Sequence, residues 1–298
     1  MSSLSSVDIP LLIEFEQSLH VGTGGGDGLV DRRVRRTAGG EPYVPASAIK
    51  GALRQTAQRL LRSLDAAAEF GDMEPSQHLG YRRRGDRTVP HRCEAPSAET
   101  MCKSRSPCLL CRVFGNVYTG RRLIVDDATA GSSPDLESRR ALLDALGQEN
   151  SGVVRDATAT GTTETVTRLQ MDRRRLGAKS GALFTTEYAR AQSVFEGRLA
   201  GSIPLTPLEN SDADGEPAEL VLLAATLRAT DQIGGEASSG RGACRIRVPD
   251  RPAPDGTDSG AGSPGAGLRV GGETYEMSTL LRPESLSALR WSRVEGGL

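Results

Sequence analysis

The sequence predicts an α+β fold, and three observations lead to that prediction. Apolar and polar residues alternate along residues 9–19 and again along residues 195–203, which is the pattern of a half-buried strand. Between these stretches, apolar residues recur at helical spacing from Ser47 to Leu64. Strands and helices interleave without the long strand–helix–strand repeats of a parallel sheet, which favours α+β over α/β.

The first three predicted elements are a strand, a loop and a helix. In the strand at 9–19 the odd positions are apolar except for Gln17. Residues 20–45 are so rich in Gly and Arg that we expect a long functional loop rather than a core element. The helix that begins near Ser47 carries apolar residues on one face, and the opposite face carries Lys50, Arg54, Gln58 and Arg62.

The middle of the chain is predicted to contain an insertion and a hairpin. Residues 65–120 lack a sustained period and hold four of the five cysteines, so we expect an insertion with its own internal cross-link. A short strand at 123–125 and a helix at 133–147, which starts with a Ser-Pro pair, come next. Residues 150–180 are polar and rich in Thr and Arg, and we expect a projecting hairpin there.

The last third is predicted to add a buried helix at 220–227, a Gly-rich loop at 231–242 and a strand that begins at Cys244. Cys244 lies on the apolar face of that strand, so we expect a small buried side chain there. Residues 249–298 are predicted to be a flexible linker and C-terminal tail, which leaves one domain at residues 1–248.

Arginines are clustered although the net charge of the chain is only −1. Three of the 37 basic residues are Lys and the rest are Arg, with clusters at 32–36, 82–87 and 168–175. Local basic surfaces on a neutral chain are typical of proteins that bind a polyanion along a track. The alternative is a genomic preference for Arg codons, which explains the residue type but not the clusters. Aromatic residues make up only 4%, so stacking platforms for bases must be sparse.

The sequence gives no indication of a membrane or secreted protein. It contains no run of about 18 apolar residues, and its N-terminus lacks the basic start and apolar stretch of a signal peptide. We therefore expect a cytoplasmic protein with no membrane partner.

Four cysteines are spaced as the ligands of a structural zinc ion would be. The spacing is C-x8-C-x5-C-x2-C, formed by Cys93, Cys102, Cys108 and Cys111. The last pair can bind one metal at about 2.3 Å each, and four thiolates leave no open coordination position. His91 is an alternative ligand for one of the four, and disulfides or unrelated free thiols are the other interpretations.

The stretch from Leu19 to Arg54 is predicted to hold an RNA backbone. It lacks both GxGxxG and GxxxxGKS, so neither a dinucleotide nor a P-loop nucleotide is indicated. Ser47 and Lys50 lie near a helix N-terminus, where free N–H groups and the helix dipole favour a phosphate. A capped helix with a solvated basic face is the alternative.

Asp31 interrupts this basic stretch. Neighbouring arginines would keep its carboxylate ionised and close to a bound phosphate, where it can hold Mg²⁺ or orient an attacking ribose 2′-hydroxyl. An Asp paired to local arginines in a solvated loop is the alternative, and Asp27 competes for the same role.

Four motifs, in this order, resemble the RAMP superfamily of CRISPR proteins. They are LHVGTGGG with VDRRVRR and PYVPASAIKGALR (19–54), CRVFGN with LIVDDA (111–128), GALFTTEYARAQSVFEGRL (181–199) and IGGEASSGRGACRI (233–246). The resemblance spans about residues 7–248, and it is strongest to the repeated backbone subunit of type III effector complexes. The segment at 181–199 resembles the part that follows the thumb in that family.

The resemblance implies a modified ferredoxin-like, RRM-related core with a projecting thumb at about 150–180 and an inserted lid, here the zinc-containing cysteine region. Such subunits stack along a CRISPR RNA, and each thumb kinks the guide–target duplex. The implied partners are CRISPR RNA, target RNA and other subunits, including copies of itself. An aspartate that cuts target RNA in type III members matches Asp31, with Mg²⁺ or another divalent cation as cofactor.

The RNA-binding residues expected from the clusters and the resemblance lie on two loops, the helix start and the thumb. They are His20, Gly22, Arg33, Ser47, Lys50, Arg54, Arg168, Arg173, Gly234, Gly235, Ser239 and Arg241. The chain has Ala46 and Ala48 where the family usually has Gly and Ser, and Arg32 where a proline commonly follows the aspartate. Two other functions stay open: a non-catalytic structural RNA-binding subunit, and a guide-processing endoribonuclease that uses His20.

Overall fold

The computed structural model describes most of the chain, and it confirms the α+β class. The described residues are 4–26, 28–69, 81–84, 87–90, 107–130, 163–172, 174, 177–191, 193–208, 216–249 and 267–289. None of the helices within these ranges is both long and apolar enough to cross a membrane.

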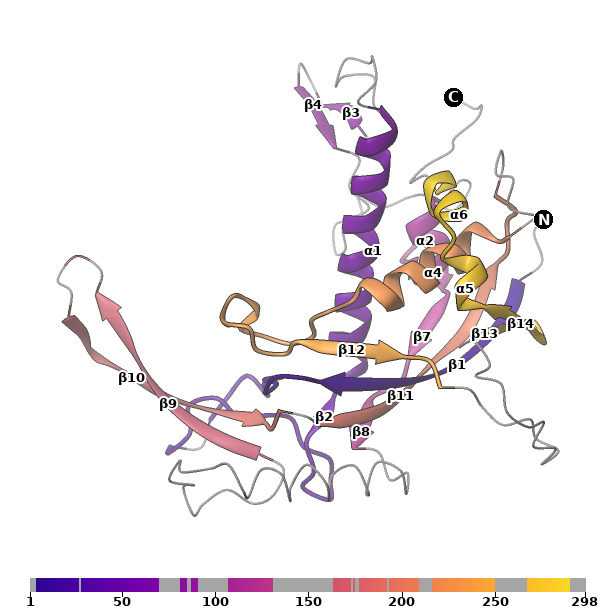
Figure 1. Cartoon of the computed structure of the whole chain (residues 1–298). Helices are drawn as coiled ribbons and strands as arrows, with labels where there is room; N and C mark the ends of the chain where they lie inside the picture. Colours follow the sequence, from indigo (N-terminus) through magenta and orange to yellow (C-terminus); the bar gives the residue numbers. More distant parts are fainter. Residues whose placement is uncertain are drawn as a thin grey trace.

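The core contains an antiparallel sheet built around β1 (Leu4–Phe15), as Figure 1 shows. One edge of β1 pairs with β11 (Val194–Pro204), and the other pairs with β12 (Cys244–Arg247) and, at Val7, with β13 (Gly267–Val270). Two short strands pair with the far edge of β11, and two more extend the sheet. These four are β7 (Leu123–Val125), β8 (Ala128–Ala130), β2 (Tyr43–Val44) and β14 (Glu273–Glu276).

The predicted alternation is present in both long strands. Ile9 pairs with Leu199 and Ile13 pairs with Phe195, and all four side chains are buried on one face of the sheet. β1 begins earlier than predicted, and it ends before Gln17, the polar residue that breaks the alternation.

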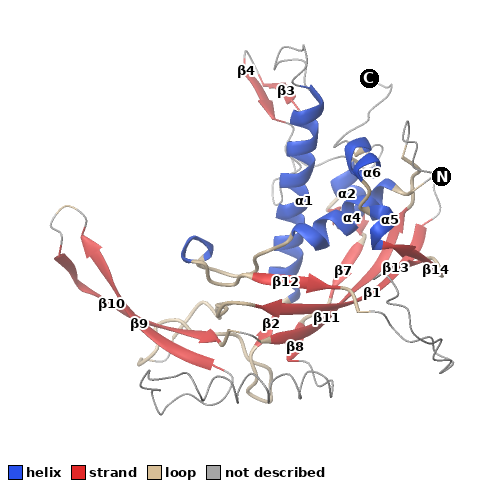
Figure 2. Cartoon of the chain, in the orientation of Figure 1, coloured by secondary structure: helices blue, strands red, loops and turns tan. Residues whose placement is uncertain are grey.

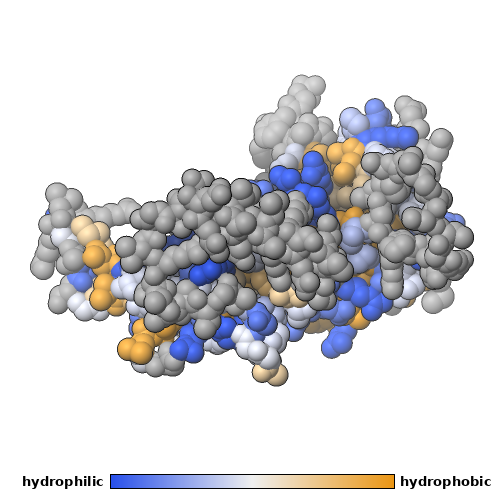
Figure 3. Space-filling model, turned by 60° about the horizontal axis from the view of Figure 1, so that its bottom comes forward, coloured by the Kyte–Doolittle hydropathy of each residue, from blue (hydrophilic) through white to orange (hydrophobic). Residues whose placement is uncertain are grey.

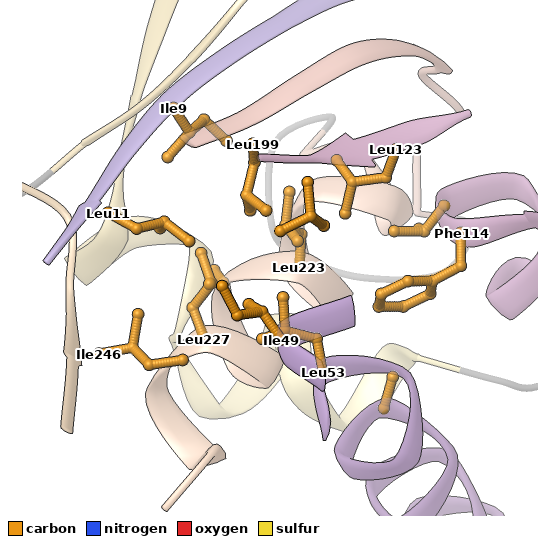
Figure 4. Close-up of a cluster of buried hydrophobic side chains, with 14 of the residues drawn as sticks. Ile9, Leu11, Ile49, Leu53, Phe114, Leu123, Leu199, Leu223, Leu227 and Ile246 are labelled. Carbon is orange, nitrogen blue, oxygen red and sulfur yellow. The ribbon is translucent and has the colours of Figure 1, made fainter. Parts of the chain in front are cut away.

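Two helices cover the apolar face of the sheet. α1 (Ala46–Glu69) and α4 (Ala218–Ala229) pack against each other there, and Figure 4 shows their side chains meeting those of the strands. α4 is buried through Leu227, as expected for a helix that is apolar on nearly all sides. Each fully buried side chain of this kind, such as Leu53 or Leu223, stabilises the fold by about 1.5–3 kcal/mol.

The opposite face of the sheet is charged. Three ion pairs join β1 and the residue after it to neighbouring strands: Asp8–Arg198 at 2.7 Å, Glu14–Arg247 at 3.1 Å and Glu16–Arg245 at 3.4 Å. Solvent reaches all three pairs, so each contributes at most about 1 kcal/mol. The even positions of β1 face this side and include no aromatic residue, so β1 itself offers no ring on which a base could stack.

A long hairpin projects from the sheet (Figure 2), and we call it the thumb. Its strands are β9 (Thr163–Asp172) and β10 (Gly177–Ala189). The hairpin lies later in the chain than the predicted 150–180, because residues 181–189, which we expected to follow the thumb, form its second strand. Residues 150–162 lie outside the described part of the chain.

Part of the predicted insertion at 65–120 belongs to the core instead. α1 continues to its end at Glu69, and α2 (Leu109–Phe114) contacts both α1 and α4. Six residues are too few for a helical period to be recognised in the sequence. Two short hairpins complete this region: β3 (Tyr81–Arg84) with β4 (Arg87–Pro90), and β5 (Gly115–Asn116) with β6 (Gly120–Arg121). The helix predicted at 133–147 lies outside the described residues.

The C-terminal region differs from the expectation that residues 249–298 are only linker and tail. Residues 267–289 form β13, β14 and two short helices, α5 (Met277–Leu280) and α6 (Pro283–Ala288), both of which contact α4. Leu268 at the start of this unit is fully buried. Its apolar residues are few and divided among four short elements, so the sequence of this region has no periodic pattern that predicts the elements.

Candidate nucleic-acid interface

A pocket of about 570 Å³ lies where two Gly-rich loops meet α1. The loop after β1 contributes His20 and Gly22, the loop before β12 contributes Gly234 and Gly235, and the first turn of α1 contributes Ser47. All five are among the predicted RNA-binding residues, and the structure brings them together. The volume lies within the range of roughly 300–1,000 Å³ that is usual for ligand sites.

Glycines allow the two loops to approach each other closely. The Gly235 N–H donates to the His20 carbonyl oxygen at 3.0 Å, and the Gly242 N–H donates to the Ser18 carbonyl oxygen at 3.0 Å. Gly234 has a φ of +100°, and a Cβ atom there would lie 2.9 Å from the His20 oxygen. A side chain at Gly234 would therefore be strained and would push the loops apart.

His20 is oriented by the thumb. Its side chain is nine-tenths buried, and Nδ1 lies 2.8 Å from the Glu187 carbonyl oxygen of β10. A carbonyl only accepts, so Nδ1 carries the proton and the neutral ring has an acceptor at Nε2. Nε2 lies beside Gly22, where a Cβ would be only 2.8 Å away, and within the described structure it has no hydrogen-bond partner.

The N-terminus of α1 already holds an anion of the protein itself. The Ala46 N–H donates to Asp127 Oδ1 at 2.7 Å, and the Pro45 carbonyl oxygen accepts from the N–H groups of Ala48 and Ile49. These contacts satisfy most of the first turn, so the expectation that the helix start attracts a phosphate is not supported.

Lys50 and Arg54 lie away from the pocket. Lys50 Nζ donates to the Leu123 carbonyl oxygen at 2.5 Å, and Arg54 Nη1 donates to the Gly115 carbonyl oxygen at 3.1 Å. Burial lowers the pKa of Lys50, and the nearby charges of Arg54 and Arg121 lower it further. These residues form a second basic group on the side of α1 that faces β5–β7.

Tyr188 joins the base of the thumb to the second Gly-rich loop. Its ring is fully buried, with the Arg241 guanidinium 4.3 Å and the Arg168 guanidinium 5.5 Å from the ring centroid. The Tyr188 hydroxyl and Arg168 Nη1 each donate to Glu236 Oε2 at 2.8 Å. Cation–π contacts and a shared carboxylate thus fix the thumb against the loop.

Glu236 is a residue that the sequence interpretation missed. It is the non-glycine residue with a positive φ, +63°, within the described ranges, a conformation that costs about 1–3 kcal/mol and clusters at functional sites. Its carbonyl oxygen accepts from the Ser239 hydroxyl at 2.8 Å. Arg241 binds the Ser18 hydroxyl and forms an ion pair with Glu164 at 3.2 Å. An acidic residue inside a Gly- and Ser-rich loop was the available signal.

Asp31 is anchored to the thumb. The Asp31 N–H donates to the Thr185 carbonyl oxygen at 2.9 Å, and Asp31 Oδ2 accepts from the Thr185 N–H at 2.6 Å. Asp31 and Arg33 are exposed, and Arg32 reaches towards Glu236 at 3.7 Å. Two predicted residues, Arg173 and Asp27, lie outside the described part of the chain.

Glu187 fastens the first loop to the thumb and was also missed. Its Oε1 is 2.5 Å from Arg36 Nη2, and its Oε2 accepts from the Val34 N–H at 3.1 Å. Together with the His20 contact, these bonds hold one wall of the pocket on β10.

The outer part of the thumb exposes apolar side chains. Leu169, Met171 and Leu183 are each at least half exposed, and Leu169 pairs with Leu183 across the two strands. Figure 3 shows apolar patches at the end of the molecule where the thumb lies, next to hydrophilic surface. Neighbouring exposed apolar residues on a projecting hairpin are typical of a contact surface.

The cysteine prediction falls mostly outside the described chain, which excludes Cys93, Cys102 and His91. Cys108 and Cys111 are buried beside the core at the start of α2. Among the described residues there is no group of three or more potential metal ligands, so the zinc site stays a prediction. Cys244 is buried as expected, and burial raises the pKa of its thiol to about 12.

Comparisons with known proteins identify the family. No protein of curated function matches the sequence. One chain of the type III-B Cmr-beta complex bound to cognate target RNA is similar, with 15% identity, a TM-score of 0.44, and coverage of 83% of this chain and 97% of that chain. A chain of the same type III-B Cmr-beta complex in its apo state is also similar, with 14% identity, a TM-score of 0.44, and coverage of 81% of this chain and 97% of that chain. The model of the RAMP superfamily matches residues 12–245. The chain therefore belongs to the RAMP superfamily.

Proposed function

We propose that this chain is a CRISPR RNA-binding backbone subunit of a type III interference complex, working in the cytoplasm with target RNA, other subunits and copies of itself. The observation that carries the proposal is the pocket in which both Gly-rich loops and α1 meet beside the arginine-rich base of the thumb. Arginines at such a junction can track a phosphate backbone, and the apolar thumb surface offers contacts to bases or to a neighbouring copy.

A modified ferredoxin-like core is part of this proposal. The strand order β12–β1–β11–β7, with α1 and α4 on one face, supports it. If arginines bind the backbone, the affinity for single-stranded RNA should fall steeply as salt rises from 50 to 200 mM, by roughly tenfold or more. A flat response in a filter-binding titration would contradict RNA binding through these residues.

We further propose that Asp31 cleaves guide-bound target RNA with a divalent cation. The Thr185 N–H fixes one carboxylate oxygen, and the other stays open to solvent for Mg²⁺ or a 2′-hydroxyl. Asp31→Asn keeps an oxygen for Thr185 but removes the charge. The assembled complex should therefore bind target RNA normally and cleave it at least about a hundredfold more slowly. Unchanged cleavage would contradict the catalytic role of Asp31.

A guide-processing endoribonuclease is the second candidate, because His20 keeps an unpaired Nε2 at the pocket. It requires the isolated chain to cut free precursor RNA, and His20→Ala to abolish that activity. The backbone-subunit proposal expects no such cutting.

We also propose that the cysteine region forms a zinc-containing lid with Cys93, Cys102, Cys108 and Cys111 as ligands. Cys108 and Cys111, the last pair of the spacing, lie three residues apart at the start of α2, and two thiols so placed can bind one metal ion. Elemental analysis should find about one zinc per chain, and Cys93→Ser with Cys102→Ser should remove it. A zinc content near zero in the wild-type protein would contradict the proposed zinc-containing lid.

A further inference from the structure

We propose that the pocket between the two Gly-rich loops receives one unstacked nucleobase of the bound RNA, rather than a phosphate. This inference rests on the proposed RNA-binding function and names the part of the RNA that this site takes.

The charges around the pocket argue against a phosphate. Among the described residues that line the pocket, Arg59 is the one with a fixed charge. Lys50 and Arg54 do not line it, and they bind carbonyl groups on the other side of α1. The helix N-terminus, the other usual attraction for a phosphate, is occupied by Asp127. Among the described lining residues a phosphate would therefore meet one guanidinium, on an exposed side chain, and the nearby Arg35 already donates to the Gly22 carbonyl oxygen.

The polar groups of the pocket match the edge of a base. His20 is nine-tenths buried and presents its unpaired Nε2 at the pocket wall. Gln232 donates from Nε2 to the carbonyl oxygens of Ala237 at 3.1 Å and Arg241 at 2.8 Å, which fixes its amide and leaves Oε1 as an acceptor. Exocyclic amino groups of bases donate to such acceptors.

The remaining wall, formed by α1 and the loop after β1, mixes the polar side chains of Ser47, Gln55 and Thr56 with small apolar groups. Ala48, Ala52 and Val21 contribute methyl groups, and Gly51 contributes bare backbone in the interior of a helix. Gly there costs about 1 kcal/mol relative to Ala, and nothing lies within 4 Å of where its Cβ would be. The missing side chain at Gly51 thus leaves open space in the pocket. A base fits such a space, because its faces are apolar and its edges carry polar groups.

The first measurement compares two probes on the full chain: a single-stranded RNA, and a ribose-phosphate oligomer of equal length that carries no bases. Wild-type protein should bind the RNA roughly tenfold more tightly, the size expected for one accommodated base. Equal affinities would overturn the base pocket while leaving RNA binding intact. Failure to bind either probe would instead defeat the proposed function.

The second measurement uses Gly51→Leu, which fills the pocket without meeting another atom at Cβ. Its thermal unfolding should be unchanged or raised, and its preference for RNA over the base-free oligomer should fall below about twofold. Ser63→Leu adds the same side chain to an exposed position of α1 outside the pocket and should keep the preference. An equal loss of affinity for both probes in Gly51→Leu would place the backbone in the pocket and overturn the proposal.

Discussion

Two glutamates of this chain each bind an arginine, but their surroundings differ. Glu219, in the first turn of α4, is fully buried, lies 3.2 Å from Arg112 Nε, and accepts from the Thr206 N–H at 2.8 Å and hydroxyl at 3.0 Å. Glu236 lies in the Gly-rich loop with 18% of its side chain exposed, and it shares its carboxylate between Arg168 and Tyr188.

The difference separates a carboxylate closed to solvent from one whose arginine partners solvent can reach. Glu219 is fully buried, and its partners come from α2 and from the loop after β11, so an anion from solvent cannot reach its place. Glu236 has a strained backbone, and its partners Arg168 and Arg32 remain 30% and 58% exposed beside the pocket. These arginines can therefore exchange the carboxylate for a phosphate of RNA.

The largest expected effect is on stability at the buried glutamate. Glu219→Ala removes the acceptor of the Thr206 N–H and hydroxyl and the counter-ion of Arg112, so the free energy of unfolding should fall by about 3 kcal/mol, measured by urea denaturation. Glu236→Ala, the matched change at the partly exposed site, should cost less, about 1.5 kcal/mol, because water reaches Arg168 while the Tyr188 hydroxyl loses its acceptor. Equal decreases in the free energy of unfolding for Glu219→Ala and Glu236→Ala would contradict the proposed difference between the two glutamates.

The sequence predicted the features that depend on local burial, but not the residues whose roles depend on distant partners. Alternation and helical spacing report local burial, so β1, β11, α1, α4 and β12 were found, and Gly and Ser motifs located much of the pocket. An i,i+4 pair such as Lys50 and Arg54 shows that two residues share a helix face, but not what covers that face. Glu236 and Glu187 gain their roles from partners tens of residues away, which no local pattern contains.

Tyr188→Phe tests the contact between the thumb and the loop with a smaller effect. The change removes one hydrogen bond to Glu236 and keeps the ring under Arg241, so the free energy of unfolding should fall by about 1 kcal/mol. Burial raises the pKa of Tyr188, and the bond to Glu236 raises it further.

A pKa raised in the folded state means that folding favours the neutral phenol. The stabilisation is present below the ordinary tyrosine pKa of 10.0 and is lost as the pH rises from there through the folded-state pKa. The free energy of unfolding, measured by denaturation, should therefore be lower at pH 11 than at pH 8 in wild type. The difference between the two pH values should be smaller in Tyr188→Phe. The same decrease in both proteins would assign the pH dependence to other groups.

Glu236→Gln should have the smallest effect on stability and a distinct effect on RNA binding. Gln keeps an acceptor for Tyr188 but no longer neutralises Arg168, so unfolding should change by about 0.5 kcal/mol or less. The released arginine can bind one more phosphate, and the slope of log K against log salt for single-stranded RNA should become steeper by up to about 1. Asp8→Asn, which removes the partner of Arg198 on the charged face of the sheet, serves as the control for charge removal elsewhere and should leave the slope unchanged. An unchanged or shallower slope in Glu236→Gln would mean that Arg168 remains committed to the protein, and Glu236 would then be as structural as Glu219.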